Sequence, residues 1–224
     1  MSSVLYVKDT NVSILSIFIY TKCKMILLLF ILFLVWYFIP IYQKPVVIPN
    51  FLSEEEINHI KKEAESKLST STIAANAIVD KTMRDSETAW LELEDPIVNR
   101  VTKRCVSLTD RPHNNCEKLQ VLRYRPGGFY NPHQDTFSDT KGNKRMYTII
   151  LALNDDYEEG ETVFPNLRRK YKLKKGDALF FHTLDNYELK TSKALHGGAP
   201  VKSGEKWVCN LWVHKHPYGA SQVE

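Results

Sequence analysis

A histidine and an aspartate stand two residues apart in the segment YNPHQDTF, which covers residues 130–137. In a β-strand, residues i and i+2 point to the same face, so His133 and Asp135 would lie roughly 7 Å apart along one face. An imidazole and a carboxylate in that arrangement can converge on one metal ion. The alternative is that both are polar residues on the solvated outer face of a strand, as most such pairs are.

A metal site needs further ligands, and His196 in SKALHGGAPV is the best candidate for the third. It ends a β-like run, and the two glycines after it allow the backbone to turn tightly. Two imidazoles and one carboxylate leave three coordination positions open, which suits the non-haem Fe(II) of oxygenases. Zinc also binds such a set, but the H-E-x-x-H motif expected for it is absent from the sequence.

The other histidines are interpreted as structural or surface residues. His214 and His216 come nearest to a second metal pair, because they are predicted to share one face of a strand. They lack a nearby carboxylate and stand close to the C-terminus. We therefore leave them out of the predicted metal site.

The candidate ligands fall in a region with the composition of a β-protein. From residue 118 onward, short runs rich in Val, Ile, Leu, Tyr and Phe alternate with Gly, Pro, Asn and Asp. Many short strands separated by such turns predict a sandwich or barrel, with a jelly roll among the options. The strand-like runs are KLQVLRYRPGGFY, RMYTIILALND, ETVFPNL, RRKYKLKKGDALFFHT, KALHGGAP and EKWVCNLWVHK.

Two helices are predicted ahead of the β region. The first begins after Ser53, which forms a capping-box pattern with Glu56 three residues later. Apolar residues at helical spacing over 57–68 give this helix one buried face. The second begins after Asp95, with a proline in the first helical position. Residues 71–92 show no helical period and are predicted to be strand or loop.

An apolar run near the N-terminus, residues 25–42, contains no charged residue and is long enough to cross a bilayer as a helix. Aromatic residues gather at its end, as they do at membrane interfaces. A cleaved signal peptide is the alternative, but its apolar core is usually shorter, and no A-x-A pattern follows here. We predict an uncleaved transmembrane signal anchor over 25–42 after an N-terminal tail over 1–24, with either Met1 or Met25 as the start.

Charge and cysteine content give little sign of other functions. The formal net charge of +4 does not by itself indicate a nucleic-acid partner. The basic run over 168–175 is interpreted as the solvated face of a strand, so no nucleic-acid binding is predicted. The four cysteines form no C-x-x-C pair, which argues against a zinc ribbon or a thioredoxin motif. A Cys105–Cys116 disulfide and two unpaired thiols both stay open.

Four segments, in this order, resemble the catalytic domain of prolyl 4-hydroxylases, which are Fe(II)- and 2-oxoglutarate-dependent dioxygenases. The resemblance covers about residues 46–216 and is strongest from 118 onward. It implies an α+β fold with a double-stranded β-helix (jelly-roll) core and flanking N-terminal helices, preceded by a transmembrane helix, with the dioxygenase domain over 46–218. The segments are LQVLRYRPGGFYNPHQDTF, RMYTIILALNDDYEEGETVFP, KKGDALFFHT and KALHGGAPVKSGEKWVCNLWV.

The resemblance also implies a role for each residue that matches a family motif. His133, Asp135 and His196 would hold the iron, and Lys206 would pair with the distal carboxylate of 2-oxoglutarate. Such pairing is needed because a buried carboxylate without a partner is costly. The other matching positions are Tyr124 and Thr162 for hydrogen bonds to 2-oxoglutarate, and Tyr130, Arg145 and Trp212 beside the peptide, with Arg145 also counted as catalytic.

The implied reaction is hydroxylation of peptidyl proline at C4, coupled to oxidative decarboxylation of 2-oxoglutarate by O2, with Fe(II) and L-ascorbate as cofactors. The implied partner is a proline-rich or collagen-like peptide. The implied location is the lumen of the endoplasmic reticulum or an equivalent secretory compartment, with the chain as a single-pass type II membrane protein.

Two other functions are weighed against this one. A hydroxylase acting on another residue, such as lysine, would typically carry Arg at position 206, whereas this chain has Lys206. A catalytically inactive, membrane-anchored peptide-binding protein would be expected to lack a ligand, and none is missing. The departures from the family pattern are Glu159 in place of a glycine, Ala199 in place of a cysteine, and a short loop between Asp135 and Arg145. They bear on substrate preference more than on activity.

Overall fold

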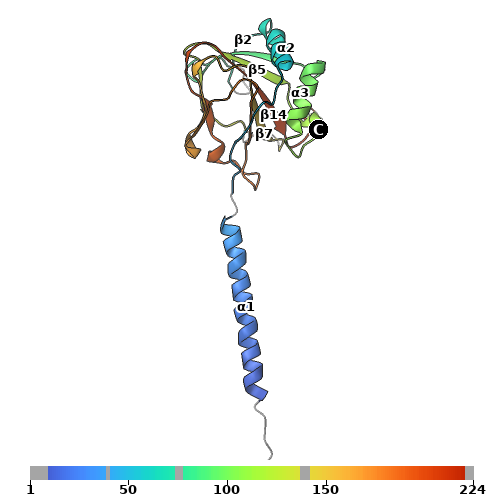
Figure 1. The fold of residues 1–224 in the computed structure, drawn as a ribbon, viewed down its shortest axis with the longest axis vertical. Helices are drawn as coiled ribbons and strands as arrows, with labels where there is room; N and C mark the ends of the chain where they lie inside the picture. Colours follow the sequence, from blue (N-terminus) through green and yellow to red (C-terminus); the bar gives the residue numbers. More distant parts are fainter. Residues whose placement is uncertain (1–9, 39–40, 74–77, 137–141, 220–224) are drawn as a thin grey trace, which may run out of the picture. The chain divides into compact units, whose positions relative to one another are not determined.

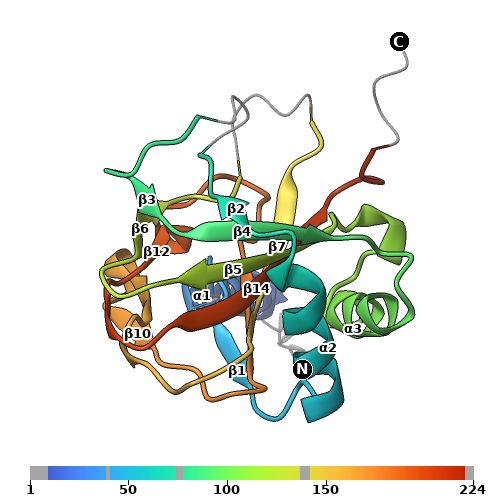
Figure 2. The same cartoon turned by 90° about the horizontal axis from the view of Figure 1, so that it is seen from above.

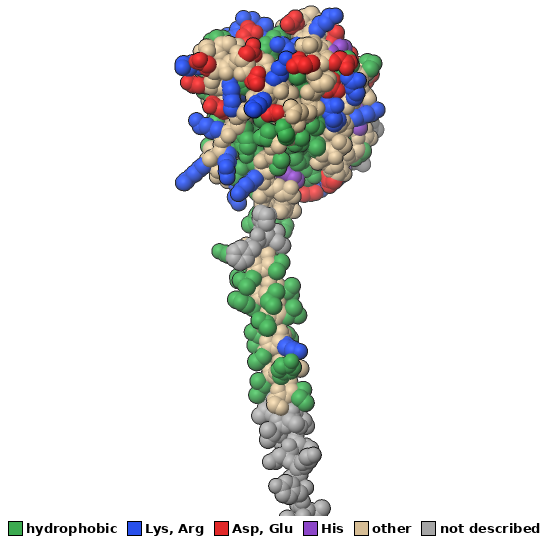
Figure 3. All heavy atoms as spheres, in the orientation of Figure 1, with side chains coloured by type: hydrophobic (Ala, Val, Ile, Leu, Met, Phe, Trp, Pro, Cys, Tyr) green, Lys and Arg blue, Asp and Glu red, His purple; other side chains and the backbone are tan. Residues whose placement is uncertain are grey.

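The computed structural model describes residues 10–38, 41–73, 78–136 and 142–219, and it divides into two compact units between Ile41 and Tyr42. The first unit is the helix α1 (Thr10–Phe38), within which Ser16–Tyr37 is long and apolar enough to cross a membrane (Figure 1). Hydrophobic side chains cover most of its described surface, whereas many acidic and basic side chains are spread over the visible face of the second unit (Figure 3). A membrane anchor and a signal sequence both have this form.

The end of the predicted membrane span belongs to the second unit. Helix α1 ends at Phe38, but Tyr42 is only 4% exposed and lies among the core residues of the folded domain. Its hydroxyl donates a hydrogen bond of 2.9 Å to the carbonyl oxygen of His182. The aromatic ring is therefore buried in the domain, and its polar tip has a partner there.

Helices α2 (Glu54–Glu65) and α3 (Pro96–Val106) begin where the sequence predicts them. The Ser53 hydroxyl accepts from the amide of Glu56, and the Glu56 carboxylate accepts from the amide of Ser53, which is the predicted capping box. The Asp95 carboxylate accepts from two amides in the first turn of α3. Both helices pack against the same sheet, beside each other (Figure 2).

The larger sheet has seven strands in the order β1-β11-β7-β14-β5-β4-β2, and every neighbouring pair is antiparallel. One face of this sheet forms a hydrophobic core with α2 and α3. The strands are β1 (Val46–Ile48), β2 (Ser69–Thr70), β4 (Glu87–Leu91), β5 (Leu119–Tyr124), β7 (Arg145–Ala152), β11 (Ala178–His182) and β14 (Lys206–His214).

The smaller sheet has five strands in the order β10-β9-β12-β6-β3, and a two-stranded ribbon, β13-β8, accompanies it. A second hydrophobic core joins the inner face of the larger sheet to the smaller one. Two antiparallel sheets that enclose a core, with helices on one outer face, make the predicted α+β jelly roll. The strands are β3 (Arg84–Asp85), β6 (Phe129–His133), β8 (Glu158–Glu159), β9 (Thr162–Phe164), β10 (Arg169–Tyr171), β12 (His196–Gly198) and β13 (Val201–Ser203), with 3-10 turns η1 (His113–Asn115), η2 (Pro165–Leu167) and η3 (Ser192–Ala194).

Strand β14 shows how the fold places side chains on the two faces of the larger sheet. Cys209, Leu211 and Val213 join the core beneath the helices. The alternate residues Asn210 and Trp212 line cavities on the opposite face. Because successive residues of a strand point to opposite faces, one set packs in the core and the other faces the cavities, so most of this strand is buried on both sides. The inner face is where the candidate site lies.

The cysteine alternatives are resolved in favour of thiols. Cys23, Cys105, Cys116 and Cys209 are all free, and the last three are buried. Burial raises the pKa of the Cys116 thiol to about 11 and that of Cys105 further. Thiols that stay protonated at neutral pH are weakly reactive, so these residues act as small apolar side chains of the core.

Candidate metal centre and the two cavities beside it

The structure brings His133, Asp135 and His196 together on the inner face of the smaller sheet. One ligand atom from each of them lies within 4.8 Å of the others. The Asp135 carboxylate oxygens lie 3.5 Å from Nε2 of His133 and 3.5 Å from Nε2 of His196. The two histidines come from neighbouring antiparallel strands, since His196 in β12 pairs with His133 in β6.

The predicted geometry of the His133–Asp135 pair was wrong, although the residues do converge. Strand β6 ends at His133, and Asp135 stands in the bend that follows it. The carboxylate is directed to the site by the chain turning and by Thr148 of β7, whose hydroxyl donates a 2.6 Å hydrogen bond to it. Asp135 is 5% exposed, so this partner satisfies a buried charge.

Backbone contacts fix the orientation of both imidazoles. The Nδ1 atom of His133 lies 2.9 Å from the carbonyl oxygen of Asn131, and Nδ1 of His196 lies 3.0 Å from that of Ala194. A carbonyl oxygen only accepts, so each Nδ1 carries the proton and each Nε2 offers a lone pair toward Asp135. This is the second hydrogen bond that metal-binding histidines typically make.

The charge states of Asp135 and His196 also suit a metal. Burial lowers the pKa of His196 to about 4, so its imidazole is neutral at physiological pH. Burial alone would raise the pKa of Asp135, but the positive charge that either imidazole carries when protonated, together with that of Arg145, holds it well below its usual value, so the carboxylate is ionised. Two neutral nitrogens and one carboxylate form the donor set of non-haem Fe(II) sites, and the residues therefore fit that ion.

The glycines after His196 serve a different purpose from the predicted turn. Gly197 and Gly198 continue strand β12, and a Cβ atom on Gly197 would lie 2.7 Å from the carbonyl oxygen of Tyr130. Only glycine allows β6 and β12 to approach this closely. The close approach is what brings the two histidine rings within 4.6 Å, centroid to centroid.

A narrow cavity beside the metal-binding trio contains the predicted 2-oxoglutarate residues. Tyr124, Thr162 and Lys206 line it, together with His133 and His196. Lys206 is 5% exposed, and its ammonium donates a 2.8 Å hydrogen bond to the carbonyl oxygen of Gly160. Among the described residues it has no ion pair with a carboxylate. Burial lowers its pKa to about 8, which shows how strongly this cation needs an anion.

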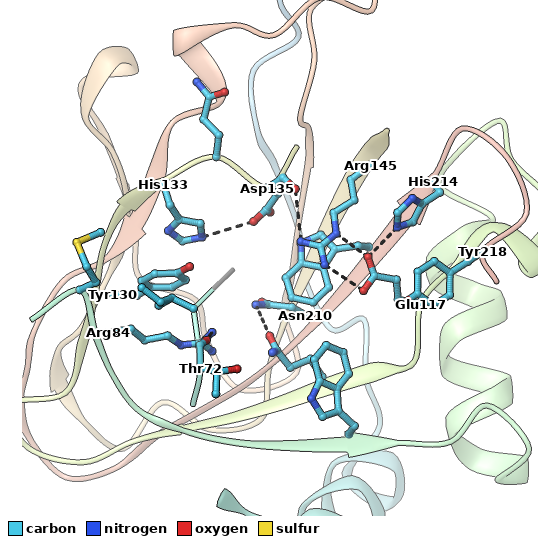
Figure 4. A pocket seen from close by; sticks show the side chains of 16 residues that line it. Thr72, Arg84, Glu117, Tyr130, His133, Asp135, Arg145, Asn210, His214 and Tyr218 are labelled. Carbon is cyan, nitrogen blue, oxygen red and sulfur yellow. Dashed lines mark hydrogen bonds and ion pairs between the residues drawn. The ribbon is translucent and has the colours of Figure 1, made fainter. Parts of the chain in front are cut away.

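A wider cavity of about 620 Å³ opens on the other side of the trio (Figure 4). The residues predicted to lie beside a peptide, Tyr130, Arg145 and Trp212, all line it. The Arg145 guanidinium carbon lies 3.8 Å from the centroid of the Trp212 ring, and Tyr130 stacks on His133 at 3.7 Å. The predicted short loop after Asp135 includes residues 137–141, which lie outside the described residues.

Glu117 and His214 are site residues that the sequence analysis missed. Both line the wider cavity, and Glu117 bonds to Arg145 at 2.5 and 3.0 Å and to Nε2 of His214 at 2.7 Å. The statement that His214 has no nearby carboxylate was therefore wrong. It also shares no strand face with His216, because β14 ends at His214. A bridge between Cys116 and Val213 brings together segments that are far apart in the sequence.

The fold and the site together define a class of enzyme. The sequence model of the 2OG-Fe(II) oxygenase superfamily matches residues 119–214, which contain the whole candidate metal site and the lysine beside it. The chain is an Fe(II)- and 2-oxoglutarate-dependent dioxygenase with a jelly-roll fold.

Individual relatives narrow the class to a family. A prolyl 4-hydroxylase homologue of Acanthamoeba polyphaga mimivirus is 35% identical, over 79% of this chain and 76% of that protein. Prolyl 4-hydroxylase 1 of Arabidopsis thaliana is 34% identical, over 76% of this chain and 68% of that protein. A viral collagen prolyl hydroxylase from Paramecium bursaria Chlorella virus 1, solved with 2-oxoglutarate, has 30% identity and a TM-score of 0.64, over 77% of this chain and 96% of that one. The chain belongs to the prolyl 4-hydroxylase family.

Proposed function

We propose that the chain hydroxylates C4 of peptidyl proline in proline-rich or collagen-like substrates. The observation that carries this is the arrangement of two unlike cavities that meet at one trio of metal-binding side chains. One cavity is narrow and holds a cation with no carboxylate partner among the described residues, and the other is wide and lined by aromatic rings and paired charges. A small dianionic cosubstrate fits the first, and an extended peptide fits the second.

The proposed ligands of Fe(II) are Nε2 of His133, one carboxylate oxygen of Asp135 and Nε2 of His196. When bound there, iron supplies the redox chemistry that couples decarboxylation of 2-oxoglutarate to oxidation of a C–H bond. The protein sets the ligand geometry through the two Nδ1 hydrogen bonds and the Thr148 hydroxyl. These contacts hold the three donors in place before any metal arrives.

Lys206 is the proposed partner of the distal carboxylate of 2-oxoglutarate. A buried ammonium bonded to a neutral carbonyl gains most from an incoming anion, since that anion supplies the missing counter-charge. The hydroxyls of Tyr124 and Thr162 stand on the same wall and would donate to the same carboxylate. This assignment makes the narrow cavity specific for a short dicarboxylate.

The wider cavity is the proposed peptide site. Its wall carries Arg145, held flat against the Trp212 ring by two hydrogen bonds to Glu117. A guanidinium fixed in this way can donate to a peptide carbonyl without losing rotamer freedom when the peptide binds. Polyproline II peptides expose unpaired carbonyls along their length, so they suit such a wall. Placing proline beside the metal excludes water from the reacting carbon.

The cellular setting is part of the same proposal. The helix within α1 would anchor the chain as a type II membrane protein, with the domain in the lumen of the endoplasmic reticulum or a related compartment. Its length and hydropathy support a membrane span. L-Ascorbate would serve as a reductant for the iron.

Succinate formation tests the proposal. Residues 42–224 would be incubated with Fe(II), ascorbate, 2-oxoglutarate and a (Pro-Pro-Gly) or (Ser-Pro) repeat peptide, and peptides would be analysed by mass spectrometry. We expect peptide-dependent succinate and a gain of one oxygen atom on proline, both lost in His133→Ala. Oxygen on lysine would assign the alternative hydroxylase activity. Peptide binding without succinate would identify a binding protein.

A further inference from the structure

The loop that provides the partner of Lys206 has an unusual backbone. Glu159 and Gly160 are consecutive residues with positive φ, +56° and +65°. At Gly160 no side chain fits, because a Cβ atom would lie 3.0 Å from a Val201 methyl carbon and 3.2 Å from the Tyr157 ring. Glycine adopts a positive φ freely. Glu159 carries a side chain, so the same conformation strains its backbone.

Lys172 lies against this loop from the neighbouring strand segment. Its ammonium donates hydrogen bonds of 2.8 Å to the carbonyl oxygen of Tyr157 and 2.8 Å to that of Glu159. It also lies 3.2 Å from the centroid of the Tyr157 ring. These contacts span the residues directly before Gly160. One cation therefore fixes the backbone at Tyr157, ahead of the strained step, and at Glu159, its first residue.

Two lysines thus bind successive carbonyls of one loop from opposite sides. Lys172 binds the carbonyl of Glu159 from outside the barrel, and Lys206 binds that of Gly160 from inside. Lys172 is also close enough to Lys206 to contribute to the lowered pKa of that ammonium. The acidic side chains that surround Lys172 are Asp155, Glu158 and Glu161. A movement of the Glu159–Gly160 step would move the acceptor of Lys206.

We propose that Lys172 is a positioning residue for 2-oxoglutarate. By holding the strained Glu159–Gly160 step, it fixes the position of the Gly160 carbonyl oxygen, which in turn orients the Lys206 ammonium. The inference rests on the proposed role of Lys206 in binding the cosubstrate. It assigns a function to a lysine that by exposure alone would count as an ordinary surface residue. Lys172 itself does not touch the cosubstrate cavity.

The test compares Lys172→Met with Lys174→Met. Both lysines are exposed and two positions apart, but the Lys174 side chain makes no hydrogen bond or ion pair with the part of the chain that the structure describes. We expect Lys172→Met to raise KM for 2-oxoglutarate about tenfold, because a buried charge loses its fixed orientation. The KM for peptide and kcat should stay within about twofold. Lys174→Met should match the wild type.

A second substitution tests whether the strain at Glu159 is the reason why the loop needs Lys172. Glu159→Gly removes the cost of positive φ, so the loop should keep its shape without the lysine. In the double variant Lys172→Met/Glu159→Gly, we expect KM for 2-oxoglutarate to return to within about threefold of the wild-type value. The single variant Glu159→Gly completes the double-mutant cycle. If Lys172 only stabilised the fold, Lys172→Met would lower Tm but would leave KM for 2-oxoglutarate at the wild-type value.

Binding measurements separate this inference from the proposed function. Calorimetry with Zn²⁺ in place of iron gives the Kd for 2-oxoglutarate without turnover, since zinc has no redox chemistry. Wild-type protein that does not bind 2-oxoglutarate would refute the proposed function itself. Wild-type binding that Lys172→Met leaves unchanged would overturn only the role of Lys172. So would an equal rise in both KM values, or a double variant as impaired as Lys172→Met.

Discussion

The two cavities beside the metal-binding trio satisfy their cations, the buried Lys206 and the half-buried Arg145, in opposite ways. In the narrow cavity, Lys206 is buried against a neutral carbonyl and the Tyr124 ring, and no carboxylate among the described residues pairs with it. In the wider one, Arg145 already has a carboxylate, Glu117, and an aromatic ring beneath it. The first cation lacks a counter-ion that a ligand would supply, whereas the second has its charge balanced by the protein.

This difference corresponds to what each cavity has to recognise. A dicarboxylate of fixed size brings its own charge, so an unpaired ammonium gives both affinity and selectivity for it. A peptide brings neutral carbonyls, and an unpaired guanidinium beside it would remain partly unsatisfied. Pre-pairing Arg145 with Glu117 avoids that cost and leaves its other donors fixed in direction.

Removing the carboxylate of the metal-binding trio, at which the two cavities meet, should have the largest effect. Asp135→Ala deletes one of the three proposed ligands and the acceptor of the Thr148 hydroxyl. We expect succinate formation to fall by at least about a thousandfold, together with loss of stoichiometric Fe(II) binding. Calorimetric metal titration and single-turnover assays measure the two effects. Retention of more than a tenth of the activity would remove Asp135 from the ligand set.

Lys206→Ala should damage only the narrow cavity. Without the ammonium, the distal carboxylate would be buried with hydroxyl donors alone, so KM for 2-oxoglutarate should rise about a hundredfold. Binding of peptide to the zinc form should be unchanged, because Lys206 does not line the wider cavity. Fluorescence anisotropy with a labelled proline-rich peptide provides that comparison. An equal loss of peptide affinity would mean that the cavities are not separate sites.

Glu117→Gln should damage only the wider cavity. The amide keeps the shape but removes the charge that holds Arg145 and His214, so KM for peptide should rise about tenfold. The KM for 2-oxoglutarate should change less than about twofold. Glu87→Gln is the matched control, because Glu87 likewise bonds two basic side chains, Arg123 and Arg125, but does not line the wider cavity. If both variants behave alike, Glu117 has no specific part in peptide binding.

Local sequence patterns were sufficient to predict the helices and the strand region. Ser53 with Glu56, and Asp95 with the following proline, are signals that lie within one turn and depend on nothing else in the fold. The metal-binding trio was found from residue types and family motifs. Its local geometry was not, because the bend after His133 comes from tertiary contacts such as the Thr148 hydrogen bond.

The missed residues depend on long-range pairing. Glu117 precedes a strand and reads as an ordinary exposed acid, and His214 ends another strand 97 positions away. Only the antiparallel pairing around Cys116 and Val213 brings their segments together, and no local pattern encodes that register. The strained Glu159 was visible in the sequence as a departure from the family pattern. Its partner, Lys172, was visible only as one member of a basic run.

The smallest predicted effect concerns pH and sharpens the contrast between the cavities. Lys206 has its pKa lowered from 10.5 to about 8, so its ammonium is charged below that value and loses its proton above it. Because the charged form binds the carboxylate, kcat/KM for 2-oxoglutarate should fall about threefold between pH 7.5 and 8.5. Binding of peptide to the zinc form should not follow this titration.

Lys206→Arg provides the control for that titration. A guanidinium stays charged throughout this range, so the variant should show a flat profile for 2-oxoglutarate between pH 7.5 and 8.5, whatever its absolute affinity. A fall of equal size in both proteins would place the titrating group elsewhere, for example on the iron or its bound water. Because kcat/KM reports the free enzyme, a flat wild-type profile would mean that the Lys206 ammonium of the empty narrow cavity keeps its proton throughout this range, which would contradict the lowered pKa.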